Sequence, residues 1–79
     1  MAILRIWNDQ DQIILEDSAD SIYTLDDLLD DYKDENKVYS SGGLGYDIKI
    51  HTNDDLLMRT DELENEAGYI VGRYEMKVY

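Results

Sequence analysis

The segment from Thr24 to Glu35 constrains the fold most strongly, because its apolar and acidic residues separate at helical spacing. Counted at about 100° per residue, four apolar residues share one side of a helix: Leu25, Leu28, Leu29 and Tyr32. The other side carries six acids: Asp26, Asp27, Asp30, Asp31, Asp34 and Glu35. A helix of this kind must bury its apolar side against another element, so the chain needs a partner layer.

The acidic side of this predicted helix repels itself. Its members form like-charge pairs four residues apart, and such pairs cost a few tenths of a kcal/mol each, together about 1–2 kcal/mol. We expect Thr24 to cap the helix, with Asp27 in the capping-box position, and the helix to end near Asn36. The helix dipole then favours the acids of the first turn and opposes those of the last. Because solubility alone does not require this cost, the pattern favours a partner that binds dense negative charge.

Composition limits the classes of function. The 79 residues predict a single domain, residues 1–79, with a modest core that buries about 60–65% of the unfolded surface. Nineteen acids against seven bases give a net charge of −12, yet 43% of the residues are apolar, which favours a folded domain over disorder. Bare nucleic acid and anionic membranes are excluded as direct partners, because the charge has the wrong sign. A basic protein surface or a cation is favoured.

Several other features concern the compartment. The chain has no Cys, so it has no disulfide framework, thiolate chemistry or Cys-built zinc site. The apolar run at Met1–Trp7 is too short for a signal peptide, and no stretch is long enough to span a bilayer. These observations suit a cytoplasmic protein.

Alternating patterns predict strands around the helix. We expect strands at Ala2–Trp7, Ile13–Leu15, Val38–Ser40, Tyr46–His51 and Tyr69–Tyr79. Between them, Asn8–Gln12 and Ser41–Gly45 are predicted as turns, and Glu16–Ser21 as an acidic connector. In the last strand Ile70, Tyr74, Met76 and Val78 share a face, and Gly72 in that face indicates a bulge or a close contact.

Residues 53–66 fit two structures. Leu56–Met58 fits a strand or a helix, and Thr60–Ala67 has the pattern of a capped short helix ended by Gly68. The predicted fold is therefore α+β: an antiparallel sheet of about four to five strands, one main helix, and a second short helix as one alternative for this stretch.

No pattern predicts catalysis, a cofactor or a metal centre. Acids on an exposed helix face lack the buried cleft that raises a catalytic carboxyl pKa. No calcium-loop spacing is present, and His51 is the only histidine. Gly42–Gly45 lacks the Lys-Ser/Thr of a phosphate-binding loop. We therefore expect a protein that is not an enzyme.

The acidic side itself is the predicted site. Side chains three or four apart on a helix lie ~5–6 Å from each other, close to the spacing of about 6–7 Å between successive phosphates on a nucleic-acid strand. The predicted partner-binding residues are Asp26, Asp27, Asp30, Asp31, Asp34 and Glu35. Asp61, Glu62, Glu64 and Glu66 form a second predicted patch, to which Asp54 and Asp55 could add.

In size, charge and patterning the chain resembles the small acidic nucleic-acid mimics of phages, the anti-CRISPR and anti-restriction proteins. The resemblance implies an inhibitor that occupies the DNA- or RNA-binding site of a bacterial defence complex, such as a CRISPR–Cas effector, in the cytoplasm of the infected host.

Other classes of function stay open. One is an antitoxin or immunity protein for a dedicated basic partner, and another is a small enzyme or cation-binding protein. Pairing of the Tyr69–Tyr79 strand between two copies would allow a homodimer.

Overall fold

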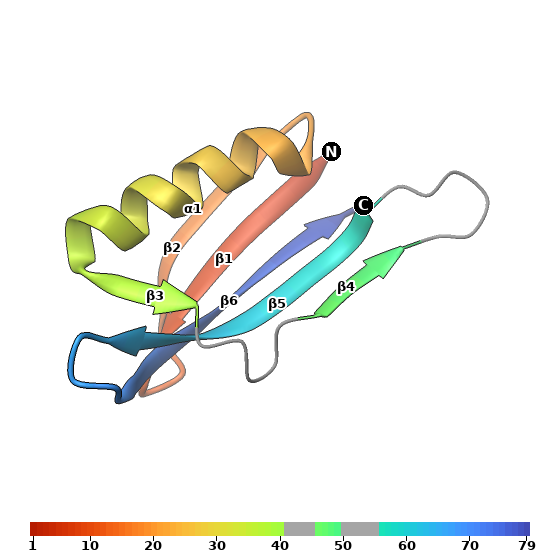
Figure 1. The fold of residues 1–79 in the computed structure, drawn as a ribbon. Coiled ribbons are helices and arrows are strands. Elements are labelled where there is room, and N and C mark those ends of the chain that lie inside the picture. The colour runs from red at the N-terminus through yellow and green to blue at the C-terminus, as the bar shows by residue number, and fades with distance from the viewer. Residues whose placement is uncertain (41–45, 50–55) are drawn as a thin grey trace.

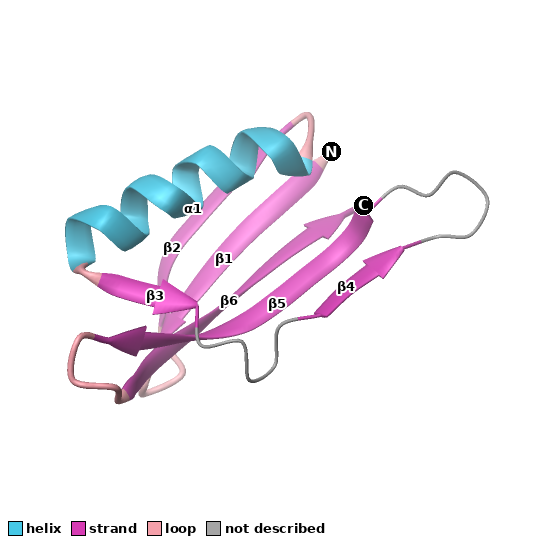
Figure 2. Ribbon diagram, viewed as in Figure 1, coloured by secondary structure: helices cyan, strands magenta, loops and turns pink. Residues whose placement is uncertain are grey.

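The computed structural model describes residues 1–40, 46–49 and 56–79, and in these residues one helix lies on one face of an antiparallel sheet (Figures 1 and 2). The elements are β1 (Ala2–Asn8), β2 (Ile13–Ala19), α1 (Ile22–Asn36), β3 (Val38–Ser40), β4 (Tyr46–Lys49), β5 (Leu56–Asn65) and β6 (Ile70–Val78). The strand order is β2-β1-β6-β5-β3, and β4 also pairs with β5. The predicted α+β class is confirmed.

The core lies between α1 and the inner face of the sheet. Alternate residues of the interior strand β1 are buried at Ala2, Leu4 and Ile6, and the matching buried positions of β6 are Tyr74 and Met76. The remaining buried apolar residues are Ile22, Leu25 and Leu29 of α1, Val38 of β3 and Leu63 of β5. The predicted apolar side of the helix thus meets Tyr74, Met76 and Val78 of the face predicted for the last strand, whereas Ile70 of that face is 42% exposed.

Gly72 marks both a bulge and a close contact in this sheet. A Cβ atom at Gly72 would lie 2.3 Å from the main-chain oxygen of Trp7 in β1. The β5–β6 register also shifts beside it, where Leu63 pairs with Gly72 and Glu64 pairs with Ile70. Only glycine allows β6 to approach β1 this closely.

The helix begins earlier than the sequence predicts. Ser21, not Thr24, is the N-cap, and its Oγ accepts a hydrogen bond from the main-chain N–H of Thr24 at 3.4 Å. The helix ends at Asn36 as predicted, and Lys37 takes the left-handed conformation after it. Because the helix starts at Ile22, its first turn contains no acid, so the favourable dipole contact predicted for Asp26 and Asp27 is wrong.

Strand β2 is longer than predicted. The acidic connector expected at Glu16–Ser21 is wrong over 16–19, because these residues continue the strand and pair with Ala2–Arg5 of β1. β2 lies at the edge of the sheet, where solvent-exposed polar side chains are tolerated in a strand.

The ambiguous stretch is a strand, and the alternative of a second short helix is wrong. β5 pairs with β6 over its central residues and with β3 at its end. Thr60, predicted as a helix cap, donates its hydroxyl to the main-chain oxygen of Tyr74 at 3.0 Å. The turn after β5 is held by Asn65, whose Oδ1 accepts from the main-chain N–H groups of Ala67 and Tyr69, each at 3.0 Å. Pairing on both sides outweighs the local helical pattern.

Some predictions fall partly or wholly on residues that are not described. The strand predicted at Tyr46–His51 is confirmed over Tyr46–Lys49. The turn at Ser41–Gly45, together with His51, Asp54 and Asp55, lies outside the described residues. Within the described part of the chain, no helix has the length and apolar character needed to cross a bilayer.

Candidate functional site

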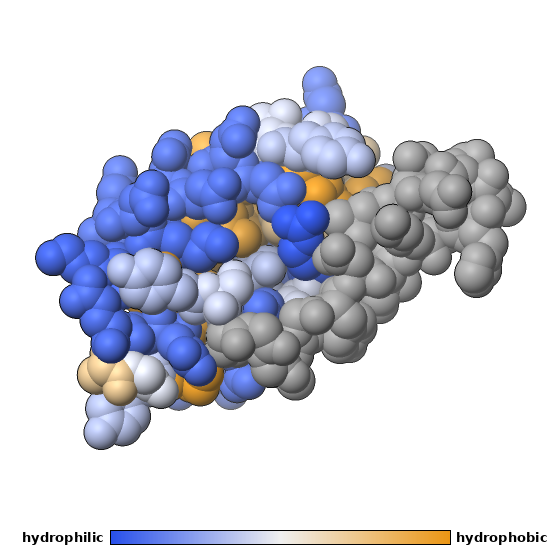
Figure 3. Space-filling model, in the orientation of Figure 1, coloured by the Kyte–Doolittle hydropathy of each residue, from blue (hydrophilic) through white to orange (hydrophobic). Residues whose placement is uncertain are grey.

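Five acids form one exposed row along α1. We call this row the acidic stripe; its members are Asp27, Asp30, Asp31, Asp34 and Glu35, and all are exposed. The stripe lies opposite the buried Ile22, Leu25 and Leu29 of the same helix. Figure 3 shows hydrophilic side chains gathered over α1, with apolar side chains visible beneath it. The acids predicted to form a phosphate-like row are therefore, with one exception, presented together to solvent.

The exception is Asp26. Its carboxylate forms an ion pair with the guanidinium of Arg59, which reaches across from β5, and the two side chains are 30% and 27% exposed. Asp26 therefore turns toward the sheet and already has a cationic partner. Asp26 is therefore half-buried in a structural ion pair and does not belong to the exposed row.

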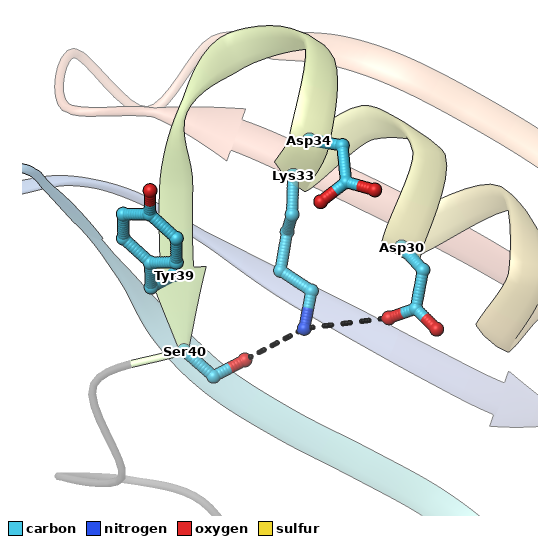
Figure 4. A pocket seen from close by; sticks show the side chains of 5 residues that line it. All are labelled: Asp30, Lys33, Asp34, Tyr39 and Ser40. Carbon is cyan, nitrogen blue, oxygen red and sulfur yellow. Dashed lines mark hydrogen bonds and ion pairs between the residues drawn. The ribbon is translucent and has the colours of Figure 1, made fainter.

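One lysine accompanies the stripe at its C-terminal end. The Nζ atom of Lys33 lies 3.7 Å from Oδ1 of Asp30 and 3.3 Å from Oγ of Ser40, so its side chain bridges α1 and β3 (Figure 4). These residues, with Asp34 and Tyr39, line an open hollow of about 380 Å³. The Lys33 side chain is 23% exposed and is paired with Asp30, so it offsets one acid of the stripe.

Three other bases lie on the opposite face of the molecule. Arg5, Arg73 and Lys77 belong to the sheet face that points away from α1, since each alternates with buried core residues. Arg5 Nε contacts Glu16 at 2.6 Å. The guanidinium carbon of Arg73 lies 4.1 Å from the centre of the Trp7 ring. These contacts hold positive charge on the face of the sheet that points away from the stripe.

The second predicted patch is divided by strand geometry. Successive side chains of β5 point to opposite faces, so Asp61 lies on the inner face, 4% exposed, while Glu62 and Glu64 lie on the outer face. Glu66 is exposed in the turn that follows. The four acids therefore do not form one surface, and Asp61 is not accessible to a partner.

Asp61 belongs instead to a polar group at the margin of the core. It pairs across the strands with the buried Tyr74, and the charge of Arg59 acts on the same tyrosine. Burial is the main cause that raises the pKa of the Tyr74 hydroxyl; a hydrogen bond with Ser40 opposes the rise, and Asp61 adds to it. This group joins β5, β6 and β3 beneath the helix and has a structural role.

Two exposed tyrosines beside the stripe were not singled out from the sequence. Tyr23 is 75% exposed and precedes Asp27 by one helical turn, and Tyr39 is 53% exposed at the hollow beside Lys33. Tyr23 could have been found had Ser21 been recognised as the cap, because the helix then includes it. No spacing in the sequence signals the position of Tyr39, which depends on how β3 pairs with β5.

Among residues 1–40, 46–49 and 56–79, no group of three or more His, Cys, Asp or Glu side chains is arranged to hold a metal ion. Comparison of the chain with protein-family models, characterised proteins and solved structures gives no match.

Proposed function

We propose that the protein is an acidic nucleic-acid mimic that inhibits a bacterial defence complex, of the anti-CRISPR kind, by occupying the complex's DNA- or RNA-binding site. The observation that carries this proposal is the acidic stripe. Five exposed carboxylates lie along one helix, where residues three or four apart are about 5–6 Å from each other, close to the spacing of phosphates on a strand.

The energetics of the helix support a functional reason for the stripe. Asp27/Asp31, Asp30/Asp34 and Asp31/Glu35 are like-charge pairs four residues apart, and the helix dipole opposes the acids of the last turn. The start of the helix at Ile22 removes the compensating first-turn contact. When a positively charged groove neutralises the stripe, this repulsion is relieved, and its relief favours binding.

The expected partner is a basic nucleic-acid-binding protein in the cytoplasm of the infected host. A net charge of −12 repels nucleic acid itself, whereas a groove of Lys and Arg side chains attracts the stripe as it attracts phosphates. Tyr23 and Tyr39, both exposed beside the stripe, supply aromatic surface for such a contact. Neither a catalytic group nor a cofactor is required for this function.

The test is capture of partners from a bacterial lysate on the immobilised protein, at low and at high salt, followed by elution with duplex DNA. Mimicry predicts recovery of a nucleic-acid-binding complex that both salt and DNA displace, because all three compete for the same cationic groups. Capture of one partner that DNA does not displace would favour the antitoxin or immunity class and contradict mimicry.

A further inference from the structure

Strand β2 leaves one edge of the sheet open. It is the first strand in the order β2-β1-β6-β5-β3, and no described strand pairs with its outer side. The two edges differ, because both β3 and β4 line the other side of the sheet along β5. An unpaired strand edge presents main-chain donors and acceptors to any extended chain that reaches it.

The hydrogen-bond pattern shows which main-chain groups face outward. The N–H of Tyr79 donates to the carbonyl of Met1 at 2.8 Å, so the odd-numbered residues of β1 direct their main-chain groups to β6. The even-numbered residues of β1 then pair with Leu15, Asp17 and Ala19 of β2. The main-chain groups of Glu16 and Ser18, which alternate with these, therefore point away from the sheet.

The outward N–H of Ser18 is bound by the side chain of the preceding residue. It donates to Oδ1 of its neighbour Asp17 at 2.8 Å, which agrees with its absence from the ladder to β1. A carbonyl of an added strand would replace this carboxylate. The carboxylate of Asp17 would then be released to bind a cationic side chain of the same incoming segment.

The side chains around the edge indicate which side chains a docking segment should carry. Asp17 and Asp20 are exposed at this end of the edge, beside Glu16, which binds Arg5, so this end of the edge is acidic. Ile13 and Ile14, at the other end, are 52% and 49% exposed. On the inner side Leu15 of β2, with Leu28 and Tyr32 of α1, forms a partly buried apolar border to the core. An extended segment with alternating basic and apolar side chains complements these features.

We infer that the β2 edge is a docking site for an extended basic segment of another protein, which adds to the sheet as a further antiparallel or parallel strand. A second copy of this chain is a poor occupant, because its β2 edge carries the same acids, Glu16 and Asp17, and no basic residue to complement them. The inference is independent of the proposed function, since it uses the sheet edge and not the acidic stripe.

The experiment uses a synthetic peptide of seven alternating lysine and valine residues with neutral ends, titrated into the isotopically labelled protein and followed by NMR. We expect the amide signals of Glu16 and Ser18 to shift and their hydrogen exchange to slow at least tenfold at saturation. Two further peptides carry N-methyl groups on all lysines or on all valines. Because an edge strand donates from alternate residues only, one of these should lose at least tenfold in affinity, and the other should bind like the parent.

The outcomes that overturn the inference are distinct. Equal binding of all three peptides would show charge attraction without strand addition, and shifts confined to the acidic stripe would place the peptide on α1. No binding at millimolar peptide would exclude the site, and signals of Glu16 and Ser18 that depend on protein concentration alone would assign the edge to a second copy. A variant of the protein gives a further check. Ser18→Pro removes the outward main-chain donor but no hydrogen bond to β1, so it should lower the affinity for the parent peptide while the circular dichroism spectrum of the protein stays unchanged.

Discussion

The guanidinium of Arg59 in β5 binds the carboxylate of Asp26 in α1, and this contact joins the helix to the strand that lies between β6 and β3 in the sheet. It also divides the six acids of the helix into one with a structural partner and five that form the acidic stripe. The two groups should respond differently to the same substitution.

Removing the charge of Asp26 should destabilise the protein. Asp26→Asn weakens a charge-assisted hydrogen bond with Arg59, so we expect the free energy of unfolding to fall by about 1–2 kcal/mol. The matched control is Asp27→Asn, one residue along the helix and exposed, which should leave stability unchanged or slightly raised. Denaturant unfolding of the two variants measures the difference, and an equal effect in both would contradict the assignment of Asp26 to a structural contact.

Reversing a charge inside the acidic stripe should stabilise the helix. Asp31 faces Asp27 and Glu35 at four-residue spacing, so Asp31→Lys converts two repulsions into attractions and should raise the free energy of unfolding by about 0.5–1 kcal/mol. The unaltered protein should become more stable as salt screens the same repulsion. Thermal unfolding at low and at high sodium chloride checks both, and a variant less stable than the parent at low salt would show that the stripe carries no strain.

Gly72 should tolerate no side chain. In Gly72→Ala the added Cβ meets the main-chain oxygen of Trp7 at 2.3 Å, which forces β1 and β6 apart and should cost about 1–3 kcal/mol. Gly68→Ala is the comparison: its φ of 84° is strained for alanine, but nothing lies within 4 Å of the new atom. That strain costs about 1–2 kcal/mol, and only the Gly72 variant should disturb the amide signals of β1.

Alkaline pH should unfold the protein partly through Tyr74. Burial raises the pKa of this hydroxyl above its ordinary value of 10.0, so the folded state holds the proton more tightly than the unfolded state. Its contribution to stability is present below about pH 10 and is lost as pH rises through the folded-state pKa. Tyr74→Phe should therefore reduce the fall in stability above pH 10, measured by denaturant unfolding across pH. Tyr23→Phe, at an exposed position, should leave that fall in place.

The sequence predicts those helices and strands that bury only one face, because their apolar residues then recur with a regular period. α1 and β6 carry clear periodicities because one face of each meets the core. β2 and β5 were harder to predict, since an edge strand such as β2 can be acidic, and β5 has a helical pattern that strand pairing overrides. Local pattern does not reveal pairing across the sheet.

The acidic stripe could also be predicted from helical periodicity, but the different positions of Asp26 and Asp61 could not. The exposure of Asp27, Asp31 and Glu35 follows from helical spacing opposite the leucines. The ion pair of Asp26 with Arg59 and the burial of Asp61 both depend on where β5 pairs in the sheet. Asp26 and Arg59 are 33 positions apart, and a contact of this kind leaves no periodic signal in the chain.

The most direct test of mimicry measures affinity for the captured complex with two variants of equal charge. Asp27→Lys with Asp31→Lys alters the stripe, and Asp9→Lys with Glu66→Lys alters exposed loops elsewhere; each pair raises the net charge by four from −12. The account predicts at least a hundredfold loss of affinity for the stripe variant and less than a tenfold loss for the loop variant. Equal losses in the two variants, or none in either, would contradict the claim that the acidic stripe is the binding surface.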